Sequence, residues 1–324
     1  MQRKSKIPSL KNRFDVDIKL DPTFLVLASF LLLQIFKLIS LLITNKTVEN
    51  ILIIPFQLLI FLLPVFVYLK YKGSEDHADP LKGLRLRLPR LYQLPLLIAS
   101  LFLLICGNIL VSLVFAGTGS LENGFTLYNT FVSRNNGGFF TSLYLIVAYA
   151  AVPAFCEELV FRALLCREYE RHNVLMGIVV SSVFFAMLHF DLFLFPVYLF
   201  SGILLALTMY ATGSSVASMV VHMAFNIFGL FGQNYLNAFY TITGGTAGLF
   251  IFILCMMTVL AAAVFCGFAS KCYAVRAKKS KMPARKLLPP ADKIITIISR
   301  ILITPFSLAS FLLYILVVVI GFLI

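Results

Sequence analysis

Long runs of apolar residues separated by short polar segments dominate this chain. Nine of the runs are long enough to cross the hydrocarbon layer of a membrane as helices, a distance of roughly 30 Å. They lie near 23–44, 51–69, 94–116, 139–165, 173–190, 193–212, 214–232, 247–269 and 301–323. Only brief breaks at Asp191 and Gly213 interrupt the middle of the series, so either junction could be a broken or re-entrant helix, and eight spans are the alternative to nine. The pattern predicts an all-α, polytopic transmembrane helical bundle.

The composition agrees with a membrane bundle and leaves no room for a sizeable soluble domain. The chain has 324 residues, of which 60% are hydrophobic and 13% are charged. Soluble domains carry about 25% charged residues, and no soluble core could hide so much apolar surface. We therefore expect membrane lipid to cover much of the protein.

The formal net charge of +13 is distributed as in a membrane protein rather than a nucleic-acid-binding protein. Of the 27 lysine and arginine residues, 23 lie in four segments, 1–21, 70–93, 166–173 and 270–300. Nine spans put all four segments on one side of the membrane, where basic residues contact anionic lipid headgroups. The positive-inside rule then predicts a cytoplasmic N-terminus. We expect a multi-pass cell-membrane protein, bacterial in view of its short loops, with membrane lipids and not nucleic acid as partners.

Few ionisable side chains fall inside the apolar runs. Of the 14 acidic residues, only Glu157 and Glu158 lie outside connecting segments and span ends. His189 and His222 lie in the fifth and seventh runs. A charged side chain at bilayer depth costs at least about 2.5–3.5 kcal/mol, so intramembrane ionisable residues indicate a functional site.

Helical spacing groups these residues further. Glu158 and Arg162 are i, i+4 and share a helix face, where an ion pair can offset part of the cost of burial. Glu157 is turned by about 100° from Glu158 and is free to point into a cavity. His222 and Asn226 are also i, i+4, so one face of the seventh run presents an imidazole and a carboxamide together.

Such a set suits the attack of water on an amide bond. A carboxylate can accept a proton from water as a general base, and His and Asn side chains can donate hydrogen bonds to the developing oxyanion. Alternatively, Glu157, His189 and His222 could hold Zn²⁺ with a bound water. The HExxH motif is absent. The residues alone leave the metal-free and the zinc mechanisms open.

Three short motifs resemble those of a known family. EELVFR, FAMLH and HMAFN are similar to the motifs EExxxR, FxxxH and HxxxN of the CPBP family, which comprises the type II CAAX prenyl endopeptidases and the bacterial Abi and bacteriocin-immunity proteins. The matching residues follow the family's order: Glu157, Glu158 and Arg162, then Phe185 and His189, then His222 and Asn226. The resemblance makes 139–232 the expected catalytic core. It lies between three N-terminal spans with a basic tail (1–138) and C-terminal spans with a basic connector (233–324).

The resemblance implies a membrane-embedded peptidase that uses a glutamate or a metal. Glu157 would activate the hydrolytic water, while Glu158 would be held by Arg162. The site would open to the cytoplasm and take peptide or protein substrates, including lipid-modified ones.

The resemblance also implies roles for the residues of the later motifs. His189 would assist Glu157 in holding the water, and His222 with Asn226 would stabilise the oxyanion.

At 1.5 Å per residue from the basic side, Glu157 and His222 lie roughly 15 Å deep, whereas His189 lies nearer 25 Å. Either the fifth run is strongly tilted, or it begins deeper, or the site is reached through a deep cavity.

Two other functional classes stay open. A family member that has lost catalysis could act as a bacteriocin-immunity or scaffold protein, although no motif residue is lost here. A transporter would also bury Glu and His, but no inverted repeat with paired broken helices is visible in the sequence. The intramembrane endopeptidase is the favoured interpretation.

Overall fold

The computed structural model describes residues 21–76, 84–115, 138–170, 173–280 and 303–323. All regular secondary structure in these ranges is helical, which confirms the predicted fold class. The elements are α1 (Thr23–Leu42), α2 (Lys46–Asp76), η2 (Leu91–Gln93), α3 (Leu94–Phe115), α5 (Phe139–Ile146), η3 (Val147–Ala151), α6 (Val152–Glu158), η4 (Leu159–Cys166), α7 (Arg167–Glu170), α8 (Val174–Met187), α9 (Phe195–Thr212), α10 (Ser215–Phe231), α11 (Gln233–Ile242), α12 (Ala247–Ser280) and α14 (Pro305–Leu323).

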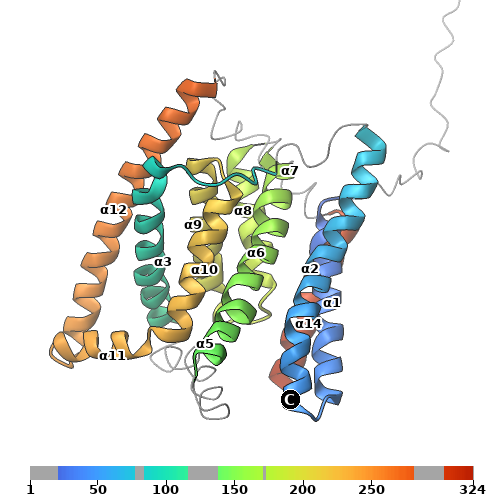
Figure 1. The fold of residues 1–324 in the computed structure, drawn as a ribbon, viewed down its shortest axis with the longest axis horizontal. Helices are drawn as coiled ribbons and strands as arrows, with labels where there is room; N and C mark the ends of the chain where they lie inside the picture. The colour runs from blue at the N-terminus through green and yellow to red at the C-terminus, as the bar shows by residue number, and fades with distance from the viewer. Residues whose placement is uncertain (1–20, 77–83, 116–137, 171–172, 281–302, 324) are drawn as a thin grey trace, which may run out of the picture.

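The helices have the lengths of a multi-pass membrane protein. In the described ranges, seven helical segments are long and apolar enough to cross a membrane, and an eighth qualifies if α10 and α11, which meet at 73°, form one broken span. Most of these helices run along one common direction (Figure 1). Each of the nine apolar runs therefore forms a helix. However, α8 has only 14 residues, a length of roughly 21 Å that falls short of a full crossing.

The two adjacent glutamates lie in the middle of one long, distorted helix over residues 139–170, called the motif helix from here on. Two π-helical segments, η3 and η4, interrupt its α-helical geometry before and after α6. Pro153 accounts for the first, because it lacks the N–H that would bond to the carbonyl of Tyr149 and its ring collides with that carbonyl. Wide π turns of this kind are frequent at functional sites. Here they bracket Glu157 and Glu158.

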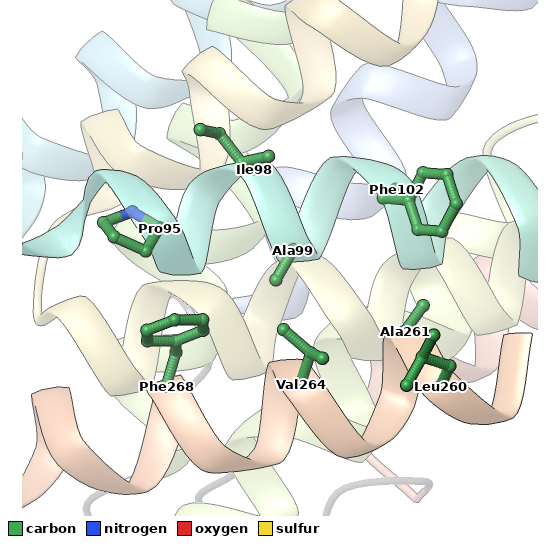
Figure 2. A pocket seen from close by; sticks show the side chains of 8 residues that line it. All are labelled: Pro95, Ile98, Ala99, Phe102, Leu260, Ala261, Val264 and Phe268. Carbon is green, nitrogen blue, oxygen red and sulfur yellow. The ribbon is translucent and has the colours of Figure 1, made fainter. Parts of the chain in front are cut away.

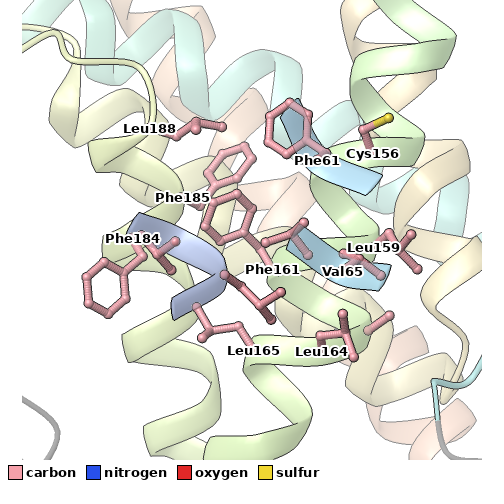
Figure 3. Close-up of a cluster of buried hydrophobic side chains, with 14 of the residues drawn as sticks. Phe61, Val65, Cys156, Leu159, Phe161, Leu164, Leu165, Phe184, Phe185 and Leu188 are labelled. Atoms are coloured by element: carbon pink, nitrogen blue, oxygen red, sulfur yellow. The ribbon is translucent and has the colours of Figure 1, made fainter. Parts of the chain in front are cut away.

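The motif helix lies between two groups of helices (Figure 1). α1, α2 and α14 pack together on one side, and α3, α9, α10 and α12 pack together on the other. Buried side chains of α2, the motif helix and α8 share one apolar core. Figure 3 shows Phe61 and Val65 of α2 near Cys156 and Leu159 of the motif helix. This core fixes the helix that carries the glutamates.

A glycine allows α8 and α9 to approach closely. A Cβ atom at Gly202 of α9 would lie 2.9 Å from the Cβ of Ser182 on α8, which is too close for two carbon atoms. Small residues allow membrane helices to pack at such short separations. The carbonyl of Gly202 also accepts a hydrogen bond from Arg162 of η4 at 3.3 Å. The same residue thus links α9 to α8 and to the motif helix.

Basic residues gather at one end of the bundle, called the basic end from here on. Lys72 of α2 pairs with Glu168 of α7, and Arg85 pairs with Glu170 at 2.5 Å. These positions agree with the predicted segregation of the basic segments. Parts of those segments lie outside the described residues, and the cytoplasmic location of this end stays a prediction.

An extended segment between α2 and α3, residues 84–90, crosses the basic end and is called the strap (Figure 1). The hydroxyl of Ser215 donates to the carbonyl of Leu84 at 2.7 Å. The hydroxyl of Ser214 donates to the carbonyl of Arg87. These bonds fasten the strap to the turn between α9 and α10.

His189 lies just beyond the end of α8. α8 stops at Met187, and the chain turns through Phe190, whose φ is 51°, before α9 begins at Phe195. His189 therefore lies in a break between two helices and not in the last turn of a full span. The break coincides with Asp191, where the sequence allowed a broken helix. Non-helical backbone at membrane depth is tolerated when protein surrounds it.

Candidate active site

Six of the seven motif residues come together in one group. They are Glu157 and Glu158 at the end of α6, Arg162 in η4, Phe185 in α8, His189 just after α8, and His222 in α10. The contacts described below join each of them to another member of the group. The site therefore depends on the packing of the motif helix against α8, α9 and α10.

Glu158 and Arg162 form a fully buried ion pair. Glu158 Oε1 lies 3.0 Å from Arg162 Nη1, and both side chains are 0% exposed. The guanidinium of Arg162 lies over the ring of Phe185, 4.1 Å from its centroid, in addition to its bond to Gly202. A buried charge is tolerated only when it is compensated in this way. Glu158 is thus held as a fixed negative charge.

His222 lies between the two glutamates. Its Nδ1 lies 3.1 Å from Glu158 Oε1, and its Nε2 lies 4.0 Å from Glu157 Oε2. A carboxylate oxygen can only accept, so Nδ1 carries the proton that is donated to Glu158. That bond orients the imidazole and turns Nε2 toward Glu157.

Glu157 differs from Glu158 in its surroundings. Its side chain is 13% exposed, whereas that of Glu158 is 0% exposed, and no arginine pairs with it among the described residues. Both glutamates keep one buried oxygen, Oε2, without a hydrogen-bond partner in the described part of the chain. Buried carboxylate oxygens normally have a donor. Because only the Glu157 side chain is partly exposed, a water molecule or a substrate group would reach this carboxylate and not that of Glu158.

His189 is fixed by its backbone neighbour and by an aromatic ring. Its Nδ1 donates to the carbonyl of Phe185 at 3.1 Å, which leaves Nε2 for another partner. Its ring stacks on that of Tyr198 in α9, with centroids 3.6 Å apart and planes 13° apart. Tyr198 was not predicted from the sequence, because a tyrosine in an apolar helix carries no signal of its own.

Phe185 acts as the packing centre of the group. Its ring centroid lies 5.3 Å from that of His189 and 5.8 Å from that of His222, both in edge-to-face geometry. It also contacts Phe161 of η4 at 5.6 Å. Phe185 therefore positions both imidazoles and the guanidinium of Arg162 without taking part in chemistry itself.

Asn226 makes none of the contacts that join the other six residues in the described part of the chain. It lies one turn after His222 on α10 and is half-buried. In the described part of the chain, no hydrogen bond or ion pair joins it to Glu157, Glu158 or His189. A ligand bound between Glu157 and His222 would have to extend along α10 to reach the carboxamide.

The residues considered for zinc do not form a ligand set. Among the residues that the structure describes, no three His, Cys, Asp or Glu side chains converge closely enough to hold a metal ion. The Nδ1 atoms of His189 and His222 are both engaged in hydrogen bonds, to the carbonyl of Phe185 and to Glu158.

Comparison with known proteins agrees with the motifs. Residues 139–228 match the family model described as type II CAAX prenyl endopeptidase Rce1-like. The match begins with α5 and ends within α10, so it contains all seven motif residues and confirms the family resemblance. Searches of curated proteins and of solved structures found no match. At the level of the family, the match supports a membrane peptidase of the CAAX-protease type.

Proposed function

We propose that this protein is an intramembrane endopeptidase in which Glu157 activates a water molecule for attack on a peptide bond. The family match supports a peptidase, and the different surroundings of the two glutamates support the choice of Glu157. Glu158 is 0% exposed, paired with Arg162 and bonded to His222, whereas Glu157 is 13% exposed and has no arginine partner among the described residues. This asymmetry carries the proposal.

The proposed reaction moves one proton through Glu157. Its carboxylate takes a proton from water as the oxygen attacks the carbonyl carbon, and it later gives that proton to the nitrogen of the departing amine. The tetrahedral intermediate then collapses, so that its oxyanion re-forms the C=O bond as the C–N bond breaks. The free Nε2 of His189, on a ring held by Phe185 and Tyr198, would help to hold the water.

The negative charge on the tetrahedral intermediate needs donors close by. His222 Nε2, when protonated, can donate to the oxyanion, and Glu158 at Nδ1 balances the charge on the imidazole. The carboxamide of Asn226, one turn along α10, can supply a second donor. Arg162 acts on this step only through Glu158.

The substrate would be a peptide or protein segment that reaches the bundle from the cytoplasm. The basic end would face the cytoplasm under the positive-inside rule, in a bacterial plasma membrane. A lipid group on the substrate would remain in the bilayer while the peptide reaches the site. A catalytically idle immunity or scaffold protein is the alternative, and a transporter is the least favoured one.

The proposal is tested with purified protein in detergent or liposomes. A quenched peptide library and a matched pair of C-terminal peptides, with and without a prenyl group, are offered to the wild type and to Glu157→Gln. Cleavage by the wild type but not by Glu157→Gln supports a peptidase. Comparison of the prenylated with the unprenylated peptide shows whether cleavage requires the lipid. No cleavage of any substrate by folded wild-type protein favours the idle alternative, whereas solute uptake by liposomes favours a transporter.

A further inference from the structure

An apolar groove lies between α3 and α12 and shares no residue with the candidate active site (Figure 2). Its volume is about 380 Å³. Its lining includes Pro95, Ala99 and Phe102 of α3 and Leu260, Val264 and Phe268 of α12. Leu260 is 64% exposed and Val264 is 40% exposed, so the groove opens to the outside of the bundle. At membrane depth, the outside is the hydrocarbon of the bilayer.

The groove reaches toward the basic end. Pro95 and Phe268 face each other at one end of it (Figure 2), near the first turn of α3. Lys271, one turn further along α12, has its ammonium 5.7 Å from the ring centroid of Phe268. Arg276 follows, roughly 12 Å beyond Phe268 along the helix axis. The apolar groove is thus followed along α12 by positively charged side chains.

Two guanidinium groups converge beyond the groove. A Cβ atom at Gly213, whose φ is 66°, would lie 2.5 Å from both Arg87 Nη2 and Arg276 Nη1. These two nitrogens are therefore within about 5 Å of each other, where two like charges repel. The strap and α12 bring them together against the turn between α9 and α10.

The described residues do not neutralise this pair. Arg87 Nη2 donates to the carbonyl of Thr212 at 3.0 Å, and Arg276 lies 5.4 Å from the ring centroid of Tyr273. Neither arginine forms an ion pair with a carboxylate in the described part of the chain. Of the acidic residues described at this end, Glu168 pairs with Lys72, and Glu170 is bonded to Arg85 and to the hydroxyl of Tyr210, each at 2.5 Å. A bound anion between the two arginines would remove the repulsion.

We propose that an acidic phospholipid binds at this place, with an acyl chain in the α3–α12 groove and its phosphate between Arg87 and Arg276. Arginine forks match phosphate oxygens, and Lys271 lies at the rim between headgroup and groove. Clusters of basic residues beside membrane helices attract anionic lipids in the same way. A free phosphate would satisfy the arginines but would leave the apolar groove unused. The continuity of groove and cations therefore favours a lipid.

The test is native mass spectrometry of the delipidated full-length protein, titrated with phosphatidylglycerol or phosphatidylcholine. We expect the wild type to bind phosphatidylglycerol more tightly. Arg87→Gln and Arg276→Gln should each weaken that binding roughly fivefold. Val264→Phe, which fills the groove, should weaken it as well. Lys70→Gln, an exposed cation on α2, is the matched control and should bind like the wild type.

Several outcomes would overturn the proposal. Equal binding of both lipids, or unchanged binding by both arginine variants, would show that the arginines do not select an acidic headgroup. Displacement of the lipid by inorganic phosphate, with no effect of Val264→Phe, would indicate an anion site without an acyl-chain groove. If an arginine variant does not fold, Lys271→Gln alters an exposed side chain and must then show the weakened binding.

Discussion

Removal of Arg162 should destabilise the protein strongly. Arg162→Met keeps most of the apolar length but deletes one side of an ion pair of 3.0 Å in which both side chains are 0% exposed. Losing one partner of a buried pair costs about 3–5 kcal/mol, because the other charge stays buried without compensation. The lost hydrogen bond to Gly202 adds about 1 kcal/mol. We expect the free energy of unfolding to fall by roughly 4–6 kcal/mol.

A double-mutant cycle separates the ion pair from general damage to the core. Glu158→Gln removes the negative charge but keeps an oxygen to accept from His222 Nδ1. Alone, this substitution should lower the free energy of unfolding by about 3–5 kcal/mol, since the charge of Arg162 is then uncompensated. The double variant has no buried charge in this pair. Its loss of unfolding free energy should therefore be smaller than the sum of the losses of the two single variants by at least about 2 kcal/mol.

The assay is reversible unfolding in mixed micelles, followed by circular dichroism during a titration with sodium dodecyl sulfate. Lys70→Met, an exposed cation on α2, serves as the control and should change the free energy by less than about 0.5 kcal/mol. Additivity of the two single variants within about 0.5 kcal/mol would refute the reasoning, because independent residues behave in that way.

Three further predictions follow from the site and its packing. Tyr198→Phe should keep most of the cleavage rate because the ring that stacks on His189 remains, whereas Tyr198→Leu should lower the rate about 10–100-fold in a peptide-cleavage assay. Gly202→Ala should cost about 1–3 kcal/mol in the same unfolding assay because its Cβ would meet Ser182, while Gly229→Ala, whose Cβ would have no neighbour within 4 Å, should cost nothing. Cleavage should persist after dialysis against chelators, with no stoichiometric metal in elemental analysis; loss of activity that zinc restores would contradict the metal-free route.

The helices were predictable because their causes are local. A membrane helix needs a long apolar run, and each of the nine runs forms a helix in the structure. The same reasoning selected the ionisable residues, because Glu157, Glu158, His189 and His222 stand out against an apolar background. The i, i+4 spacing predicted that Arg162 pairs with Glu158, and the three ordered motifs predicted that these residues share one site.

The remaining features depend on packing between helices, which the linear pattern does not contain. The stacking of Tyr198 on His189 requires α8 to end early and α9 to return beside it. The bond from Arg162 to Gly202 requires α9 to pack beside the motif helix. The π-helical segment η4 and the short helix α11 have no sequence signal comparable to Pro153 in α6. The place of Asn226 in the reaction stays a prediction.

Glu157 is proposed here as the base that activates water. Glu157→Gln keeps the shape of the side chain, and Oε2 makes no hydrogen bond to the described residues, so stability should change little. The decisive measurement is the single-turnover cleavage rate of this variant on the best library peptide, with unfolding recorded on the same sample. We predict a fall of about 10²–10⁴-fold at unchanged stability. A rate within about tenfold of the wild type would contradict this role of Glu157.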